Sequence, residues 1–138
     1  MEPIAIFRPV VALVALTALV LGRIPYVRFR AGRRRQVTFD DFRFGESPQV
    51  PPEVVLPNRN LMNLLELPIL FYVLALALYV TQRVDGAALA MAWAYVALRA
   101  MHSLVHLTIN VVPLRLVLFA LSNGVLLAMW LRFALQIS

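Results

Sequence analysis

The chain has 138 residues, of which 62% are hydrophobic and 14% are charged. Soluble domains carry roughly 25% charged residues, and a soluble protein of this length could not bury so many apolar side chains, so the composition excludes a soluble globular domain. The net charge is +6 and every basic residue is Arg, which beside long apolar runs indicates a membrane surface rather than a nucleic acid as partner. The chain has no Cys, which excludes disulfides and cysteine-based catalytic or metal sites.

Four apolar runs cover most of the chain, at residues 3–22, 61–82, 87–109 and 114–137. Each has about 20 residues or more, enough for a helix to cross roughly 30 Å of hydrocarbon, and none shows the alternation of a membrane barrel. The first run is interpreted as a retained span rather than a signal peptide, because six arginines follow it closely and no A-x-A-like cleavage site precedes them. The sequence therefore predicts an all-α integral membrane protein, a four-transmembrane-helix bundle in one domain, 1–138.

The connections between these runs are unequal. Residues 23–60 form a long polar loop with eight arginines, whereas the connections around 83–86 and 110–113 are short. The positive-inside rule places the long loop in the cytoplasm and both termini on the opposite side. The short, Arg-only chain suggests a bacterial inner membrane, with periplasmic termini. The arginine cluster itself has two interpretations: it sets topology and attracts anionic lipid, or one of its members holds a carboxylate.

Ionisable groups inside the spans mark the candidate site. Each costs about 2.5–3.5 kcal/mol on insertion scales and so needs a partner or a purpose. Helical spacing predicts one polar face on the second span and one on the third, formed by Arg59, Asn63 and Glu66, and by Arg99, His102 and His106. Arg115 opens the fourth span at the same, loop-facing end. The cluster either neutralises itself, by pairing Glu66 with Arg99 or Arg59, or receives a small zwitterionic or anionic ligand.

Other features have simpler interpretations. Pro68 is expected to kink the second span, and Arg132 to be an interfacial anchor. The two histidines lack an HExxH motif, so no metal site is predicted. A proton pathway through Glu66, His102 and His106 is disfavoured because the far halves of the second and third spans are almost wholly apolar.

Two motifs carry a resemblance to a known family: Arg59-x3-Asn63-x2-Glu66, and Arg99-x2-His102-x3-His106 followed nine residues later by Arg115. With four spans and a long basic first loop, the chain resembles the MAPEG family, the membrane-associated proteins of eicosanoid and glutathione metabolism. The resemblance covers nearly the whole chain. It implies a homotrimer with a glutathione site at each subunit interface, open to the cytoplasm.

The resemblance also implies roles for individual residues. Arg59, Asn63 and Glu66 would hold glutathione, with Glu66 on the γ-glutamyl amine and Arg59 on a carboxylate. His102 and His106 match family positions that contact the peptide, beside Arg99 on the same face. An arginine of the first loop would assist with a carboxylate; Arg30 is the preferred match, and Arg28 aligns almost as well. Arg115 matches the arginine that stabilises the glutathione thiolate, and a nearby cation does lower a thiol pKa.

The function implied is that of a glutathione-dependent membrane transferase or peroxidase, with glutathione as co-substrate. The thiolate would attack lipophilic electrophiles or hydroperoxides dissolved in the surrounding lipid. The alternative is a non-catalytic lipid-binding or scaffold trimer in which the polar cluster only holds the helices together.

Overall fold

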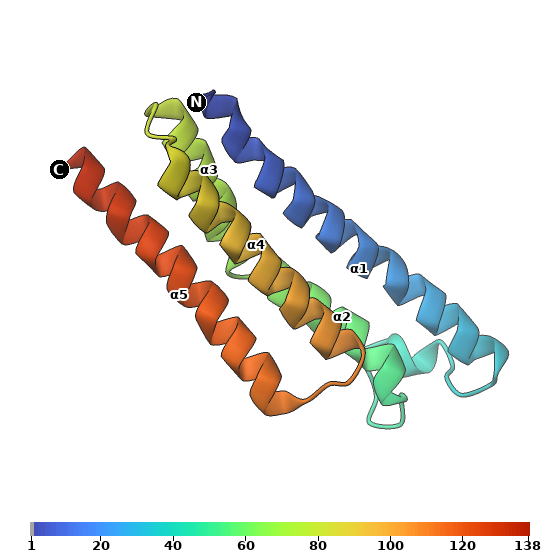
Figure 1. Ribbon diagram of the computed structural model, residues 1–138. Coiled ribbons are helices and arrows are strands. Elements are labelled where there is room, and N and C mark those ends of the chain that lie inside the picture. The colour runs from blue at the N-terminus through green and yellow to red at the C-terminus, as the bar shows by residue number, and fades with distance from the viewer. Residues whose placement is uncertain (1) are drawn as a thin grey trace.

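The computed structural model describes residues 2–138 as long antiparallel helices (Figure 1). A short 3-10 helix, η1 (Pro3–Ile6), leads into α1 (Phe7–Arg33), and a second, η2 (Asp40–Phe42), lies in the following loop. The remaining helices are α2 (Pro52–Leu65), α3 (Pro68–Val80), α4 (Gly86–Leu107) and α5 (Val112–Ile137). Four segments, 3–33, 52–80, 86–107 and 112–137, are long and apolar enough to cross a membrane. The predicted all-α membrane fold is confirmed.

The irregular connection is shorter than the predicted loop 23–60, because residues 23–33 continue α1 and residues 52–60 belong to α2. Hydropathy identifies the apolar part of a helix but does not show where the helix begins or ends. Arg and Ala favour helix, so α1 continues through Pro25 into its basic final turns. Pro52 occupies the first turn of α2, where its fixed φ angle and missing N–H are well tolerated.

The second span is broken rather than continuous. α2 ends at Leu65, Glu66 has a non-helical ψ of −96°, and α3 restarts with Pro68 in its first turn. A proline inside a helix removes one hydrogen bond and crowds the carbonyl four residues earlier, which explains a break at this point. The expected kink at Pro68 is therefore a complete interruption between two helices.

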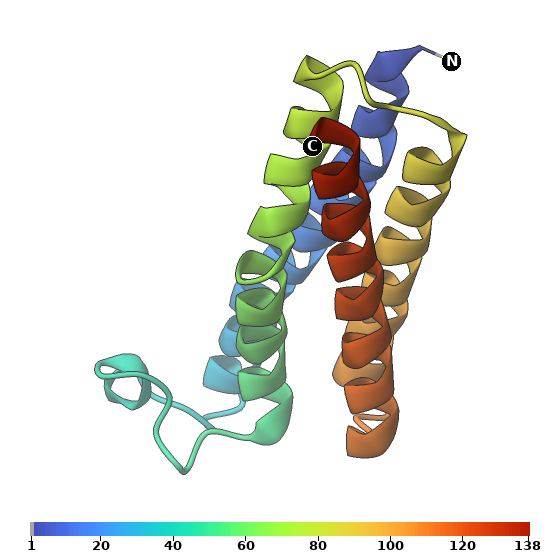
Figure 2. The ribbon, with the colours of Figure 1, turned by 90° about the vertical axis from the view of Figure 1, so that its left-hand side faces the viewer.

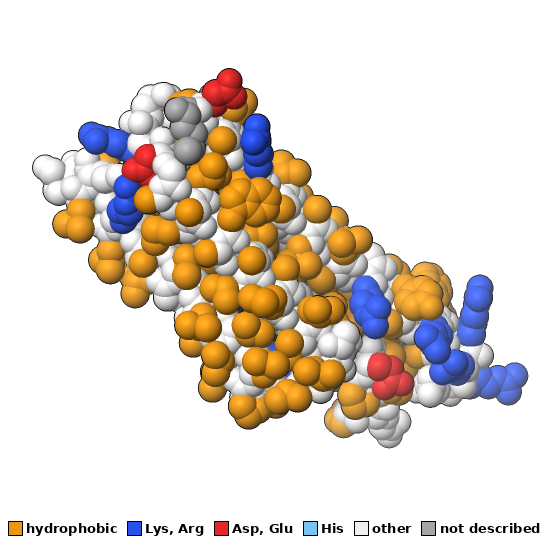
Figure 3. Space-filling view, in the orientation of Figure 1, with side chains coloured by type: hydrophobic (Ala, Val, Ile, Leu, Met, Phe, Trp, Pro, Cys, Tyr) orange, Lys and Arg blue, Asp and Glu red, His pale blue; other side chains and the backbone are white. Residues whose placement is uncertain are grey.

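The helices pack in pairs, α1 beside α2 and α4 beside α5, and α4 also contacts α1 and α2. Their apolar core is continuous along the bundle, and in it the Phe71 and Tyr95 rings stack with centroids 4.8 Å apart. Both termini and the α3–α4 turn lie at one end, with the η2 loop at the other (Figure 2). On the face shown in Figure 3, hydrophobic side chains cover the middle and charged ones gather near the ends.

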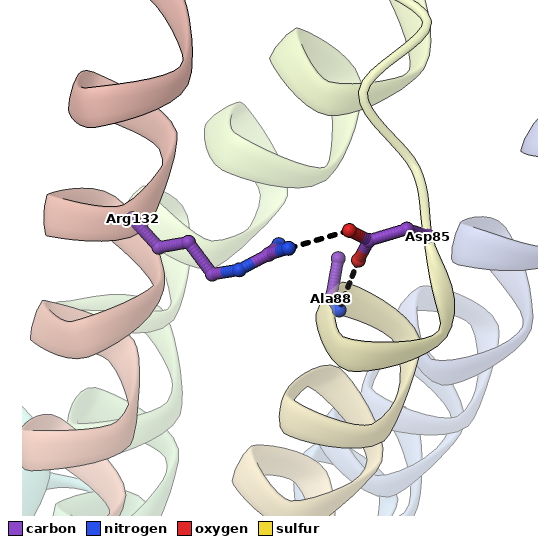
Figure 4. Close-up of polar contacts among 3 residues, drawn as sticks. All are labelled: Asp85, Ala88 and Arg132. Atoms are coloured by element: carbon purple, nitrogen blue, oxygen red, sulfur yellow. Dashed lines mark hydrogen bonds and ion pairs between the residues drawn. The ribbon is translucent and has the colours of Figure 1, made fainter.

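At the end that carries the termini, one carboxylate joins α4 to α5 (Figure 4). Asp85 caps α4 by accepting the Ala88 N–H at 2.8 Å, and its second oxygen accepts from Arg132 of α5 at 2.5 Å. The Arg132 hydrogen bond, followed by that from Ala88, holds the pKa of Asp85 below its ordinary value. Arg132, expected as an interfacial anchor, therefore also has an ion-pair partner.

Replacing Asp85 by Ala removes both interactions. Loss of an N-cap costs about 1 kcal/mol and loss of an exposed ion pair up to about 1 kcal/mol, so the melting temperature in detergent at pH 7 should fall. Because the folded-state pKa is depressed, this stabilisation is present above the ordinary pKa of 3.8 and is lost as the pH falls through the lower folded value. Asp85→Asn keeps an acceptor for the helix cap, so its melting temperature should fall by less. If D85A melted at the same temperature as the wild type at pH 7, Asp85 would not stabilise the contact between α4 and α5.

Candidate functional site

A buried polar stripe runs along the second half of α4. Arg99 is fully buried at 0% exposure, and three further polar side chains that follow it on the same face are also buried: His102, Ser103 and His106. Their spacing places them one above another on one side of the helix. The predicted face of the third span therefore exists, and Ser103 belongs to it as well.

The stripe meets α2 through two polar contacts. The Arg99 guanidinium (Nη2) donates to the backbone carbonyl of Asn63, and the Ser103 hydroxyl donates to Asn60 Oδ1 at 3.3 Å. Asn60 is itself fully buried, whereas the Asn63 side chain turns back to bond the Arg59 carbonyl at 3.1 Å. The sequence interpretation missed Asn60 and Ser103; the only signal was their position beside Arg59 and His102.

Toward α5 the stripe meets an aromatic ring. Phe119 lies 5.6 Å from the Arg99 guanidinium carbon and 5.9 Å from the His102 ring, measured to its centroid. The His102 and His106 rings lie 5.7 Å apart, edge to face. A cation within about 6 Å of an aromatic face is attracted to it, so Phe119 helps to hold the buried guanidinium.

Arg115 lies at the start of α5, half-exposed, at the same end of the bundle as the stripe. Its Nη1 donates to Asn110 Oδ1 at 2.5 Å. Asn110 ends the α4–α5 turn in the left-handed region, with φ 47°, a conformation that Asn tolerates better than most residues. The turn thus holds the Arg115 guanidinium through one of its terminal nitrogens, while the side chain remains partly exposed.

Two predicted residues of the second span are not buried with the stripe. Arg59 and Glu66 are both exposed on the surface of the single chain, and so is Arg30 on α1. Within residues 2–138 the ion pairs are Arg28–Glu46 and Arg132–Asp85, so Glu66 pairs with neither Arg99 nor Arg59. The structure brings Asn63, Arg99, His102 and His106 together and leaves Arg30, Arg59 and Glu66 on the surface.

Several buried polar atoms in the stripe have no partner among residues 2–138. They are Arg99 Nε and Nη1, His102 Nδ1, both ring nitrogens of His106, and Asn60 Nδ2. Buried polar atoms are nearly always hydrogen-bonded in folded proteins, so this stripe can accept further polar partners. The described residues contain no group of three or more His, Asp or Glu that could hold a metal ion, so a small polar molecule suits the stripe better.

The chain was compared with family models, curated proteins and solved structures. No curated protein and no solved structure matches the chain. The family model of the MAPEG family matches residues 6–135, which include all four membrane-spanning segments but for a few terminal residues and every residue of the candidate site. The chain belongs to the MAPEG family.

Proposed function

We propose that this protein is a glutathione-dependent transferase or peroxidase that acts on lipophilic electrophiles or hydroperoxides at the membrane surface. The observation that carries the proposal is the arrangement at the end of α2: the Asn60 side chain and the Asn63 backbone carbonyl bond the buried stripe of α4, while Arg59 and Glu66 are exposed at the same end. Exposed charged residues beside a stripe with unpartnered polar atoms suit a ligand held between neighbouring subunits. Family membership makes glutathione the leading candidate.

The exposed charges match the charges of glutathione. Glu66 would bind the γ-glutamyl ammonium group and Arg59 a carboxylate, as charge-assisted hydrogen bonds are roughly twice as strong as neutral ones. His102 and His106 would bind polar atoms of the peptide with their unpartnered ring nitrogens. Arg30 would complete the carboxylate contacts from α1, and Arg99 would hold Asn63 in place through its carbonyl.

Arg115 would stabilise the thiolate. A cation near the sulfur favours the charged form, and the thiol proton leaves to water. The thiolate then forms a carbon–sulfur bond with an electrophile that reaches the site from the lipid, and the leaving group departs with its electron pair. The protein would thus join a water-soluble nucleophile to a lipid-soluble substrate.

The orientation follows from the same charges. The arginine-rich end, with η2 and the starts of α2 and α5, would face the cytoplasm, where glutathione is dissolved. Both termini would lie on the opposite side, which is the periplasm if the host membrane is a bacterial inner membrane. A homotrimer would bring Arg59 and Glu66 of one subunit against its neighbour.

Calorimetry of glutathione binding to the nanodisc-embedded protein tests the site. Glu66→Gln and Arg59→Ala should each weaken binding by roughly tenfold or more, since hydrogen bonds to charged groups contribute about 1.5–3 kcal/mol. Glu53→Gln, on an exposed residue in the first turn of α2, is the matched control and should bind normally. If a folded wild-type protein takes up no glutathione, the proposal is wrong.

Arg115→Ala tests the thiolate role. The thiol pKa of bound glutathione, followed by thiolate absorbance against pH, should rise by about one unit, which corresponds to about 1.4 kcal/mol. Turnover of a chromogenic aryl halide near neutral pH should fall by about tenfold for the same reason, and Arg115→Lys should recover part of both losses. Unchanged turnover and an unchanged thiol pKa in R115A would remove Arg115 from the mechanism.

A scaffold function is the second candidate, because part of the polar cluster already joins helices. Arg99 and Ser103 bond α2 within the single chain, as polar residues do in membrane bundles. In that case Glu66→Gln would destabilise the assembly without removing any ligand, and the calorimetric titration would be flat for every variant.

A further inference from the structure

A hollow lies outside the candidate site, between the last turns of α1 and the loop that carries η2. Its volume is about 670 Å³, and its wall is mainly apolar, formed by Ile24, Pro25, Phe29 and Gly32 of α1 with Val37 and Phe42 of the loop. Arg28 and Arg33 also reach its surface. Cavities of this size suit a small ligand or one lipid chain.

The loop wall is fixed on α1 by Arg28. Its Nη2 lies 3.3 Å from Glu46 Oε1, and its guanidinium carbon lies 4.4 Å from the centroid of the Phe42 ring. Behind it, Val27 and Ala31 of α1 form a small apolar cluster with Val50 and Val54. The cavity is therefore bounded by packed side chains on both sides.

The loop also holds its own shape through Asp41. The Asp41 carboxylate accepts from the Ser47 hydroxyl at 2.6 Å, from the Thr38 N–H at 2.7 Å and from the Thr38 hydroxyl at 2.9 Å. These bonds, led by that from Ser47, lower the pKa of Asp41 below its ordinary value. Thr38 and Phe39 on the cavity rim are thus tied to η2.

This cavity is separate from the proposed glutathione site. Arg30 does not line the cavity, although its neighbours Arg28, Phe29, Gly32 and Arg33 along α1 do. None of Asn63, Arg99, His102, His106 or Arg115 lines it.

Its position and charge indicate what it binds. The first helical segment has 31 residues, or about 46 Å at 1.5 Å per residue, against roughly 30 Å of hydrocarbon, so its basic end reaches headgroup level. Residues 23–46 carry seven arginines and three acidic residues. Phe29 and Phe39 on the cavity wall are 73% and 97% exposed. Apolar walls below an excess of cations complement a molecule with an acyl chain and an anionic head.

We propose that the cavity binds one anionic phospholipid, with an acyl chain against the phenylalanine wall and the phosphate near Arg33. Arg28 is occupied by Glu46 and Phe42, whereas Arg33 is exposed and is followed by two more exposed arginines, Arg34 and Arg35. The arginine cluster of the first loop then does more than set topology: it selects a lipid at a built site.

Gly32→Leu tests the cavity itself. A Cβ added at Gly32 meets no heavy atom of another part of the chain within 4 Å, so the new side chain fills the cavity without a clash. Gly22→Leu, on the same helix, is equally unhindered and lies outside the cavity lining, which makes it the matched control. Circular dichroism confirms that both variants remain helical.

The readout is native mass spectrometry of protein released from nanodiscs of phosphatidylglycerol or of phosphatidylcholine. The wild type and Gly22→Leu should retain one phosphatidylglycerol per chain and little phosphatidylcholine, whereas Gly32→Leu should lose it. Arg33→Gln should weaken the preference for phosphatidylglycerol by about fivefold, as expected for one arginine near an anionic headgroup, and Arg23→Gln should not.

Three outcomes would overturn the proposal. One is equal lipid retention by Gly32→Leu and Gly22→Leu, and another is equal retention of the two lipids by the wild type. The third is a change of subunit number in Gly32→Leu without loss of lipid, which would mean that a second copy of the chain covers the cavity. Glutathione titration of the same variants tests the proposed function separately.

Discussion

The structure depends on the burial of a guanidinium inside an apolar bundle. Arg99 has no exposed surface, and a charge at the centre of a membrane helix costs about 2.5–3.5 kcal/mol on insertion scales. The cost is offset by a hydrogen bond to the carbonyl of Asn63 and by the ring of Phe119. In an uninterrupted helix that carbonyl would accept the N–H of Leu67, but Leu67 lies in the break before Pro68. The proline thus frees the acceptor that the arginine uses.

The same break explains how the end of α2 contacts α4 while charged residues beside it stay exposed. Its last turn carries carbonyls without helical partners, and that of Asn63 accepts from Arg99 of α4. Ser103 of α4 bonds the nearby Asn60 side chain. Arg59 and Glu66 then lie on the outer surface of the bundle. The end of α2 therefore bonds the buried stripe and also carries an exposed charge, with Glu66 exposed just after it, and the proposed site between subunits rests on this arrangement.

Hydropathy and helical period were enough to predict the four spans and the polar stripe of α4, because both depend on local sequence. They could not predict where α1 ends or α2 begins, since charged residues such as Arg30 and Arg33 continue a helix without adding hydropathy. They also missed Asn60 with Ser103, and Asp85 with Arg132, pairs that are 43 and 47 residues apart. Such contacts depend on how neighbouring helices align, and helical spacing within one segment says nothing about that alignment.

The two ends of the bundle differ in how their charges are satisfied, and this difference is the basis for proposing chemistry at one of them. At the end with the termini, Asp85 binds both the start of α4 and Arg132 of α5, so that end is closed. At the other end arginines outnumber carboxylates, Arg115 is bonded only to a neutral amide, and both histidines keep unpartnered nitrogens. This end therefore has the charges and the unpartnered polar atoms that the proposed glutathione and phospholipid would use, and the hollow between α1 and the η2 loop is separate from the polar stripe of α4.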